Sequence, residues 1–233
     1  MENEYCYGQY LDSIFQRSNC FSAEELRQHC ISFENNHGRF LPANRFARIL
    51  DIGCGAGHFL HFLMKKGYAN FLGIDLSEQQ VKFCRENVSP RVERADAFAF
   101  LDTCGGFYDV IVANDLLEHI AKTDVLALLR LIFRALKPEG VFISKTPNLG
   151  NPFAIFLRYK DFTHEIGYTE MSMYQVLWVA GFRDITIAPL AQKGLREKML
   201  SRVIFFLLRK LFWHQGFVAP RILSPVLISV ARK

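Results

Sequence analysis

The chain has 233 residues, of which half are hydrophobic and 22% are charged, a balance typical of a globular domain rather than a disordered chain. A net charge of +5 is too small by itself to indicate nucleic-acid binding. No stretch reaches the ~18 uninterrupted apolar residues of a membrane-spanning helix. The six scattered cysteines fit neither a disulfide framework nor a zinc site. With no secretion signal at the start, they favour a cytoplasmic protein.

The N-terminal part, residues 1–45, reads as a helical cap made of helix and loop. Ser22, followed three residues later by Glu25, predicts a capped helix start. From Arg48 onward the pattern changes, and residues 46–233 read as one domain.

Short apolar runs of strand length alternate with segments of helical period. The predicted strands are 47–52, 70–74, 91–95, 108–113 and 140–144, and the predicted helices are 58–66, 77–87, 97–102 and 122–136. Continuous apolar strands separated by helices predict an α/β fold with a doubly wound, mostly parallel sheet. In such a fold the ligand site lies beyond the carboxyl ends of the strands.

The end of the chain departs from this alternation. Two further strands, 182–189 and 226–231, are joined by a basic, aromatic, helical insertion at 191–222. Residues 191–233 contain nine basic residues and one acidic residue, so the basic charge is concentrated there. Aromatic and aliphatic side chains interleaved with arginine and lysine suit peripheral membrane contact through 195–217, at the inner face of the membrane, although an apolar stripe is more often part of a core. The other interpretations are packing on the sheet, a dimer face or a substrate cover.

The segment Asp51-Ile52-Gly53-Cys54-Gly55-Ala56-Gly57 ends a strand and opens a helix. Glycines permit the tight turn and a close approach of a ligand to the backbone, and the helix start favours an anionic group. Asp75 follows the next strand, where a carboxylate can bind both ribose hydroxyls. The glycine spacing is G-x-G-x-G rather than the dinucleotide pattern G-x-G-x-x-G, since His58 stands where that pattern needs its third glycine. This spacing disfavours a nicotinamide oxidoreductase.

The glycine segment resembles motif I of the class I S-adenosylmethionine-dependent methyltransferases. The resemblance covers roughly residues 47–190. It includes Asp96 after the third strand, the segment Tyr108-Asp109-Val110-Ile111 with Leu117-Glu118-His119, and the turn Leu136-Lys137-Pro138-Glu139-Gly140. It implies a Rossmann-like seven-stranded sheet with an antiparallel last strand. It also implies S-adenosylmethionine as cofactor and S-adenosylhomocysteine as product. The cofactor-binding residues that we expect are Asp51, Gly53, Cys54, Gly55, Gly57, Asp75, Leu76, Asp96, Ala97 and Asn114.

Methyl transfer to a hydroxyl needs alignment and usually a base that removes a proton. The loop after the fifth strand is polar and rich in proline and glycine. In it His164 is the expected base, and Asp161 is expected to orient its other nitrogen. The alternative is that both residues close a turn. The stretch Tyr159-Lys160-Asp161-Phe162-Thr163-His164-Glu165 resembles a subgroup associated with bacterial surface-polysaccharide and nucleotide-sugar pathways. This resemblance implies a sugar or glycan hydroxyl as acceptor.

Asp115, Glu118 and His119 form a second group, spaced to share one helical face. Quinone-pathway O-methyltransferases show a similar E-x-x-E-H arrangement, and such a group can bind a divalent metal. We favour the simpler interpretation of a capped helix start, with Asp115 as cap and Glu118 closing a capping box, and expect no metal. His119 remains an alternative base. Tyr10, His37 and Arg39 are candidates to cover the cofactor.

The sequence thus predicts a methyltransferase acting on a small-molecule or glycan hydroxyl, with no nucleic-acid partner, as a monomer or homodimer. One alternative is an O- or N-methyltransferase of an aromatic or other natural product. Another is a non-catalytic nucleoside-binding module that has lost its base.

Overall fold

The computed structural model describes residues 21–191 and 194–233. Its centre is a seven-stranded sheet with the order β3-β2-β1-β4-β5-β7-β6. The strands are β1 (Ile49–Ile52), β2 (Phe71–Asp75), β3 (Val92–Arg94), β4 (Tyr108–Asn114), β5 (Leu136–Pro147), β6 (Ile185–Pro189) and β7 (Val226–Arg232). The first five strands pair in parallel, whereas β7 is antiparallel to both β5 and β6. The predicted fold class and the antiparallel last strand are confirmed.

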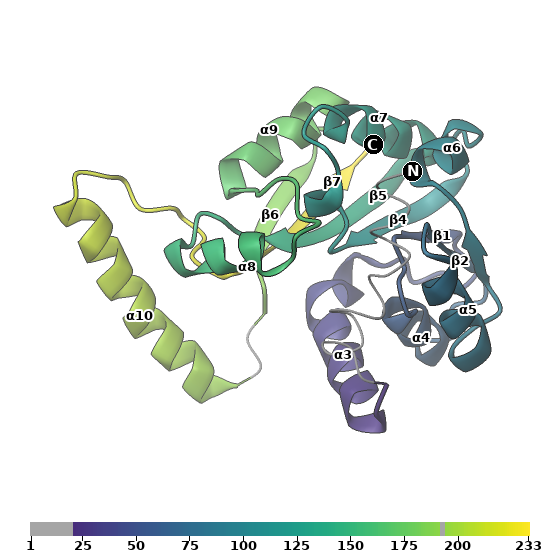
Figure 1. Ribbon diagram of the computed structural model, residues 1–233, viewed down its shortest axis with the longest axis horizontal. Coiled ribbons are helices and arrows are strands. Elements are labelled where there is room, and N and C mark those ends of the chain that lie inside the picture. The colour runs from purple at the N-terminus through teal and green to yellow at the C-terminus, as the bar shows by residue number, and fades with distance from the viewer. Residues whose placement is uncertain (1–20, 192–193) are drawn as a thin grey trace.

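Helices cover both faces of this sheet (Figure 1). The α-helices are α3 (Ala23–Asn36), α4 (His58–Lys65), α5 (Glu78–Asn87), α6 (Ala97–Asp102), α7 (Val125–Ala135), α8 (Ile155–Lys160), α9 (Glu170–Ala180) and α10 (Leu195–His214); the 3-10 helices are η2 (Gly38–Phe40), η3 (Leu117–His119) and η4 (Pro152–Ala154). One apolar core packs α6, α7 and α9 on the sheet, and the other packs α3, α4 and α5 on the opposite face. As predicted, Ser22 caps α3, its side chain accepting from the amide of Glu25.

Strand β1 contains one acidic residue, Asp51, among side chains that pack into the two cores. Leu50 and Ile52 belong to the core under α7, and Ile49 belongs to the core under α4. Side chains alternate along a strand, so Asp51 shares the α4 face with Ile49. Asp51 is 1% exposed, a carboxylate enclosed at the end of an otherwise apolar strand.

The fifth strand begins earlier than the sequence predicts. The proline and glycine of residues 136–140 predict a turn before a strand at Gly140, yet β5 starts at Leu136. Glu139 has a φ of 62°, and the pairing of β4 with β5 shifts register between Tyr108 and Val110. The expected turn is therefore an irregularity inside the strand, because β4 supplies pairing partners on both sides of it.

The loop that follows β5 is held against the end of β4. The amides of Glu165 and Ile166 donate to the carbonyl of Glu118 in η3, over 2.8 and 3.2 Å. Tyr168, fully buried, donates from its hydroxyl to the carbonyl of Leu117. These bonds place residues 161–166 at the carboxyl edge of the sheet, where the site lies.

The helix predicted within the insertion before the last strand is α10. It stands apart from the sheet in Figure 1. In the described part of the chain, no helix combines the length and the hydropathy that crossing a membrane requires.

Candidate active site

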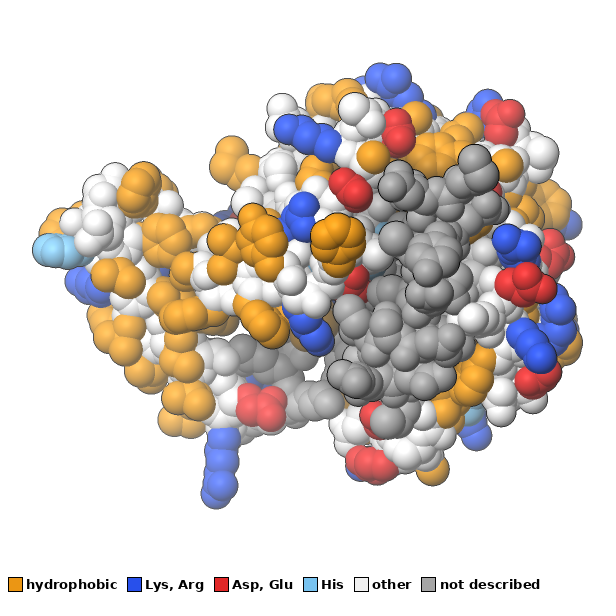
Figure 2. Space-filling model, in the orientation of Figure 1, with side chains coloured by type: hydrophobic (Ala, Val, Ile, Leu, Met, Phe, Trp, Pro, Cys, Tyr) orange, Lys and Arg blue, Asp and Glu red, His pale blue; other side chains and the backbone are white. Residues whose placement is uncertain are grey.

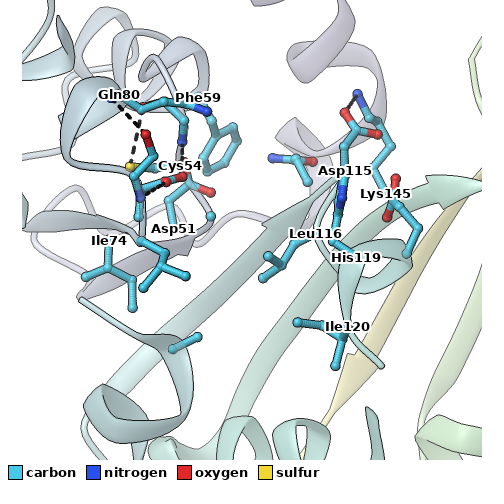
Figure 3. Close-up of a pocket in the computed structure, with 18 of the residues that line it drawn as sticks. Asp51, Cys54, Phe59, Ile74, Gln80, Asp115, Leu116, His119, Ile120 and Lys145 are labelled. Atoms are coloured by element: carbon cyan, nitrogen blue, oxygen red, sulfur yellow. Dashed lines mark hydrogen bonds and ion pairs between the residues drawn. The ribbon is translucent and has the colours of Figure 1, made fainter. Parts of the chain in front are cut away.

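A cavity of about 650 Å³ lies at the carboxyl ends of β1, β2, β4 and β5. In Figure 3, Asp51 and Cys54 from β1 and its loop face Asp115, His119 and Lys145 from the ends of β4 and β5. The expected cofactor-binding residues that line it are Asp51, Gly53, Cys54, Gly55, Asp75, Leu76, Asp96, Ala97 and Asn114; the expected catalytic residues His119, Asp161 and His164 line it too. The remaining expected residue, Gly57, is not part of the lining.

The glycine segment has the backbone that only glycine adopts readily. Gly53, Gly55 and Gly57 have φ values of 69°, 53° and 87°. A Cβ on Gly53 would lie 2.9 Å from Cδ1 of Leu116, and one on Gly57 would collide with Sγ of Cys84. Gly57 is the N-cap residue of α4, so its role is to let the helix start close to α5 rather than to touch a ligand.

Asp75 joins the end of β2 to this segment. Its Oδ2 accepts from the amide of Gly55 and its Oδ1 from the amide of Ser77, both over 2.9 Å. A carboxylate oxygen can accept more than one hydrogen bond, so each oxygen of Asp75 can also accept a hydrogen bond from a ligand hydroxyl. Asp96 caps α6, with Oδ1 accepting from the amide of Ala99 over 2.9 Å, and thus stands fixed at the same edge.

The buried polar atoms of the lining that have no hydrogen-bond partner among the described residues include Oδ1 of Asp51 and Nδ2 of Asn114. The other amide atom of Asn114, Oδ1, accepts from Nε2 of His37 over 2.8 Å. Burial lowers the pKa of His37 to about 4, and burial, then the charge of Asp75, raises the pKa of Asp51. Asp51 can accept from an ammonium group, and Asn114 can donate to a carboxylate. These atoms suit the amino-acid end of S-adenosylmethionine, and Asp75 suits its ribose.

His164 is held by the main chain. Its Nδ1 lies 2.7 Å from the carbonyl oxygen of Leu157 in α8. A carbonyl only accepts, so Nδ1 carries the proton and Nε2 of the neutral ring keeps a lone pair. The expectation that Asp161 would orient the other nitrogen of His164 is wrong, because the carbonyl of Leu157 already occupies that nitrogen.

Asp161 instead begins a chain of hydrogen bonds that ends on His119. Its Oδ1 accepts from the hydroxyl of Thr163 over 2.7 Å, and Oγ1 of Thr163 lies 2.8 Å from Nδ1 of His119. Since the hydroxyl proton goes to Asp161, Thr163 must accept from Nδ1 of His119. Burial, then the neighbouring His164, lowers the pKa of His119 to about 4.

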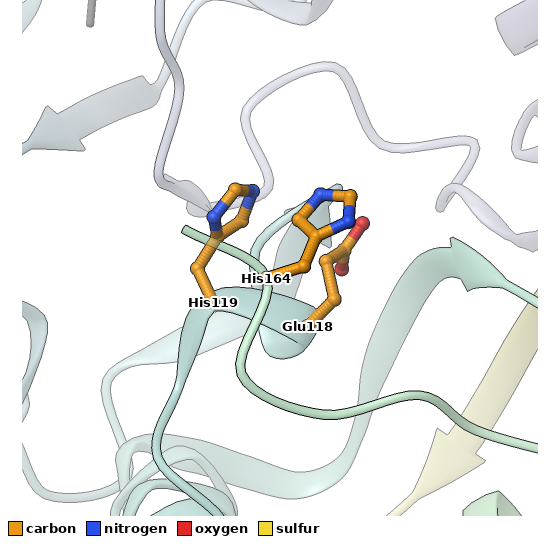
Figure 4. Close-up of side chains that lie close together, drawn as sticks. All are labelled: Glu118, His119 and His164. Carbon is orange, nitrogen blue, oxygen red and sulfur yellow. The ribbon is translucent and has the colours of Figure 1, made fainter. Parts of the chain in front are cut away.

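The side chains of His119, His164 and Glu118 lie close together (Figure 4), and all three residues line the cavity. The rings of His119 and His164 are 4.6 Å apart at an angle of 72°. One ligand atom of each of Glu118, His119 and His164 lies within 4.8 Å of the others. Glu118 is 2% exposed, and burial, then the charge of Asp115, raises its pKa well above the usual range.

Asp115 does not belong to this group. Its carboxylate pairs with Nζ of Lys145 over 2.5 Å. The predicted capping box is wrong: Asp115 has a φ of 52°, and the short helix that follows starts after Leu116 with no side-chain cap. A 3-10 turn replaces the expected α-helix, so the i, i+3, i+4 spacing does not gather the three residues.

Of the residues expected to cover the cofactor, Tyr10 lies outside the described residues. His37 contacts the lining through Asn114, whereas Arg39 lines a different cavity. Three residues of the site were not predicted from the sequence: Lys145 and Lys160, which line the cavity, and Thr163, which contacts His119. Lys145 had a signal, because it directly follows the predicted fifth strand. Thr163 had none, since its hydrogen bonds depend on how the loop folds.

The family model described as a methyltransferase domain matches residues 11–187. A ubiquinone biosynthesis O-methyltransferase of Methylococcus capsulatus is 33% identical over 106 residues, which are 43% of this chain and 44% of that protein. The chain thus spans less than half the length of the curated relatives it matches.

Two solved structures show the same fold. A SAM-dependent methyltransferase from Archaeoglobus fulgidus has a TM-score of 0.63 at 24% identity, covering 90% of this chain and 92% of that chain. A Haemonchus contortus phosphoethanolamine N-methyltransferase, solved with S-adenosylhomocysteine, has a TM-score of 0.64 at 20% identity. The match covers 97% of this chain and 60% of that chain. The comparisons support S-adenosylmethionine as the cofactor, and the glycine segment, Asp75 and the unpartnered polar atoms fit it. With a family match over most of its length and a cavity of this chemistry, the chain belongs to the methyltransferase domain family.

Proposed function

We propose that this protein transfers a methyl group from S-adenosylmethionine to a hydroxyl oxygen of a sugar or glycan. The observation that carries the proposal is the hydrogen bond between His164 and the carbonyl of Leu157. Since His164 lines the cavity, this bond leaves Nε2 with a lone pair that can take the proton of an acceptor hydroxyl.

When bound, S-adenosylmethionine supplies a methyl group made electrophilic by its positively charged sulfur. Asp75 would hold the ribose, Asp96 the adenine, and Asp51 with Asn114 the amino-acid end. During methyl transfer, Nε2 of His164 would take the proton of the acceptor hydroxyl. The imidazolium then gives this proton to solvent.

His119 has a different role in this proposal. A pKa of about 4 makes it a poor proton acceptor at neutral pH. Its Nδ1–H is committed to Thr163, which fixes the ring, and the residue lines the cavity beside His164, where it would orient the acceptor. The base is therefore assigned to His164, and His119 is assigned to positioning.

The sugar assignment rests on the resemblance of residues 159–165 to the polysaccharide subgroup and on the polar lining from Asp161, Lys160 and His119. A second candidate is O-methylation of an aromatic hydroxyl. Phe33, Phe59 and Phe98 line the cavity, and the relative from Methylococcus capsulatus is an O-methyltransferase of ubiquinone biosynthesis.

The test is turnover of labelled S-adenosylmethionine on a panel of nucleotide-sugars and substituted phenols, with the methylated atom located by NMR. We expect methylated sugar oxygens. The decisive variant is His164→Asn, whose amide can still donate to the carbonyl of Leu157 but offers no basic nitrogen. It should lower the rate about 10²- to 10⁴-fold while the affinity for S-adenosylhomocysteine stays unchanged. An unaltered rate would remove His164 as the base, and methylation of phenols alone would favour the second candidate.

A further inference from the structure

The helix α10 turns a narrow side toward the rest of the protein. Apart from Leu195, whose side chain is not described, its less exposed residues are Ser201, Phe205, Leu208 and Phe212. Their spacing of four, three and four residues defines one stripe of an α-helix. The rest of the helix surface faces away.

Large apolar side chains cover much of that outer surface. Met199, Val203, Phe206, Leu207, Leu211 and Trp213 are each at least 56% exposed. At about 100° of rotation per residue, they spread over roughly half of the helix circumference. A monomer rarely exposes an apolar patch of this kind without a partner for it.

Basic side chains line one edge of this apolar surface. Lys198, Arg202 and Arg209 fall within roughly 40° of one another, between the inward stripe and the apolar side. Lys210 and Arg196 fall within the apolar side itself, and Lys210 lies over the ring of Phe206, 5.6 Å from its centre. The helix contains one acidic residue, Glu197.

The helix α8 presents a second surface of the same kind beside the cavity. Its residues Tyr159 and Phe156 are 77% and 65% exposed, and Phe153 of the preceding η4 is 69% exposed. Leu157 and Lys160 of the same helix line the cavity. Figure 2 shows hydrophobic side chains gathered over both α10 and the region of α8.

We propose that α10 and α8 form a docking surface for an anionic lipid bilayer, with α10 lying in the membrane interface. An amphipathic helix with aromatic and aliphatic residues on one side and arginine and lysine at the edge binds such a surface by apolar burial and charge attraction. Since α8 also lines the cavity, docking would bring the acceptor end of the site close to the lipid surface.

Charge and shape favour a bilayer over a second copy of the chain. Pairing of two helices buries a narrow seam of apolar residues, whereas the apolar side of α10 is about half its circumference wide. Two copies would also bring together two segments that each carry nine basic residues and one acidic residue. A bilayer with acidic lipid can bury a wide apolar side and attracts the basic charge.

The first test is flotation of the full chain with vesicles of phosphatidylcholine, with and without phosphatidylglycerol. It needs neither methyl donor nor acceptor, so it is independent of the proposed reaction. We expect flotation with the acidic vesicles only. Arg202→Glu should lower the bound fraction about tenfold or more, since each basic residue near the surface contributes to binding. Lys82→Glu, an exposed position on α5, should not.

The apolar contribution is tested with Phe206→Ser against Phe46→Ser, which removes an exposed phenylalanine of the loop before β1. Only the first should release the protein from acidic vesicles. Trp178 and Trp213 are the two tryptophans of the chain, so Trp178→Phe leaves Trp213 as reporter. Its emission should shift to the blue with acidic vesicles and be quenched by brominated lipid.

Three results would overturn the proposal. The first is flotation with neither vesicle, and the second is equal flotation with both. The third is a dimer that Phe206→Ser dissociates while Trp213 shows no response to lipid, because the apolar side of α10 would then be an interface between two copies.

Discussion

The carboxylate of Asp75 accepts a hydrogen bond from the amide of Gly55 over 2.9 Å, and this bond ties the end of β2 to the loop after β1. The glycine loop and Asp75 are thus one unit. A carboxylate that orders the loop also presents its remaining lone pairs to the cavity.

Asp75→Asn should weaken binding of S-adenosylmethionine roughly ten- to hundredfold. The amide loses the negative charge and one of the two acceptor oxygens, and a hydrogen bond to a charged group contributes about 1.5–3 kcal/mol. Titration calorimetry measures the change. The matched control is Asp102→Asn, at the exposed end of α6, where the carboxylate pairs with Arg134. Equal affinity for the two variants would contradict this role of Asp75, and tight binding of NAD would revive the oxidoreductase alternative.

Gly57→Ala should destabilise the fold more than Gly67→Ala does. Both glycines have a positive φ, 87° and 79°, so both variants lose about 1–2 kcal/mol of backbone energy. A Cβ at position 57 also collides with Cys84, whereas one at 67 meets nothing within 4 Å. Overpacking adds about 1–3 kcal/mol. Urea unfolding followed by circular dichroism gives the difference, and equal losses would refute the close packing of α4 against α5.

On acidification the unfolding free energy of the wild type should fall more than that of His37→Gln. The folded pKa of His37 is about 4, against an ordinary 6.5, because burial disfavours the charged ring. Between these values the unfolded chain binds a proton that the folded chain does not, so this stabilisation is present above pH 6.5 and falls as the pH drops. Over the whole range between the two pKa values, the unfolding free energy should fall by about 3 kcal/mol. Unfolding free energies of both proteins from pH 7 to 4 measure it. A stability difference that stays constant over that range would rule the pKa shift out.

Treatment with EDTA should leave turnover unchanged. Glu118, His119 and His164 lie close enough to hold an ion, but in our proposal the two histidines meet the acceptor directly. Activity that disappears with the chelator and returns with a single divalent metal would reassign the three residues to a metal site. It would also withdraw His164 as the base.

The sequence predicted the fold and the cofactor side of the cavity well because both depend on local patterns. The apolar runs of the strands, the helical periods and the spacing from Gly53 to Asp75 are all patterns of residues that lie close together in the sequence. Parallel strands then bring their carboxyl ends together whatever the loops do. This is why Asp51, Asp96 and Asn114 line one cavity as expected.

On the side of the cavity formed by the loop after β5, the sequence predicted which residues are present but not their hydrogen-bond partners. His164 and Asp161 lie in the expected loop, yet the partner of His164 is the backbone of Leu157, which no residue type reveals. Asp115 looked like a helix cap and is instead paired with Lys145, because the chain turns with a positive φ and η3 is too short for a capping box. His37 reaches Asn114 across 77 residues of sequence. Such contacts arise from tertiary packing, which local pattern cannot supply.

A crystal structure of the protein with S-adenosylhomocysteine tests the account most directly. We predict the ribose hydroxyls on Asp75, the adenine beside Asp96 and the sulfur directed toward His164. A ligand bound elsewhere, or a sulfur turned away from His164 and His119, would contradict the assignment of this cavity to methyl transfer.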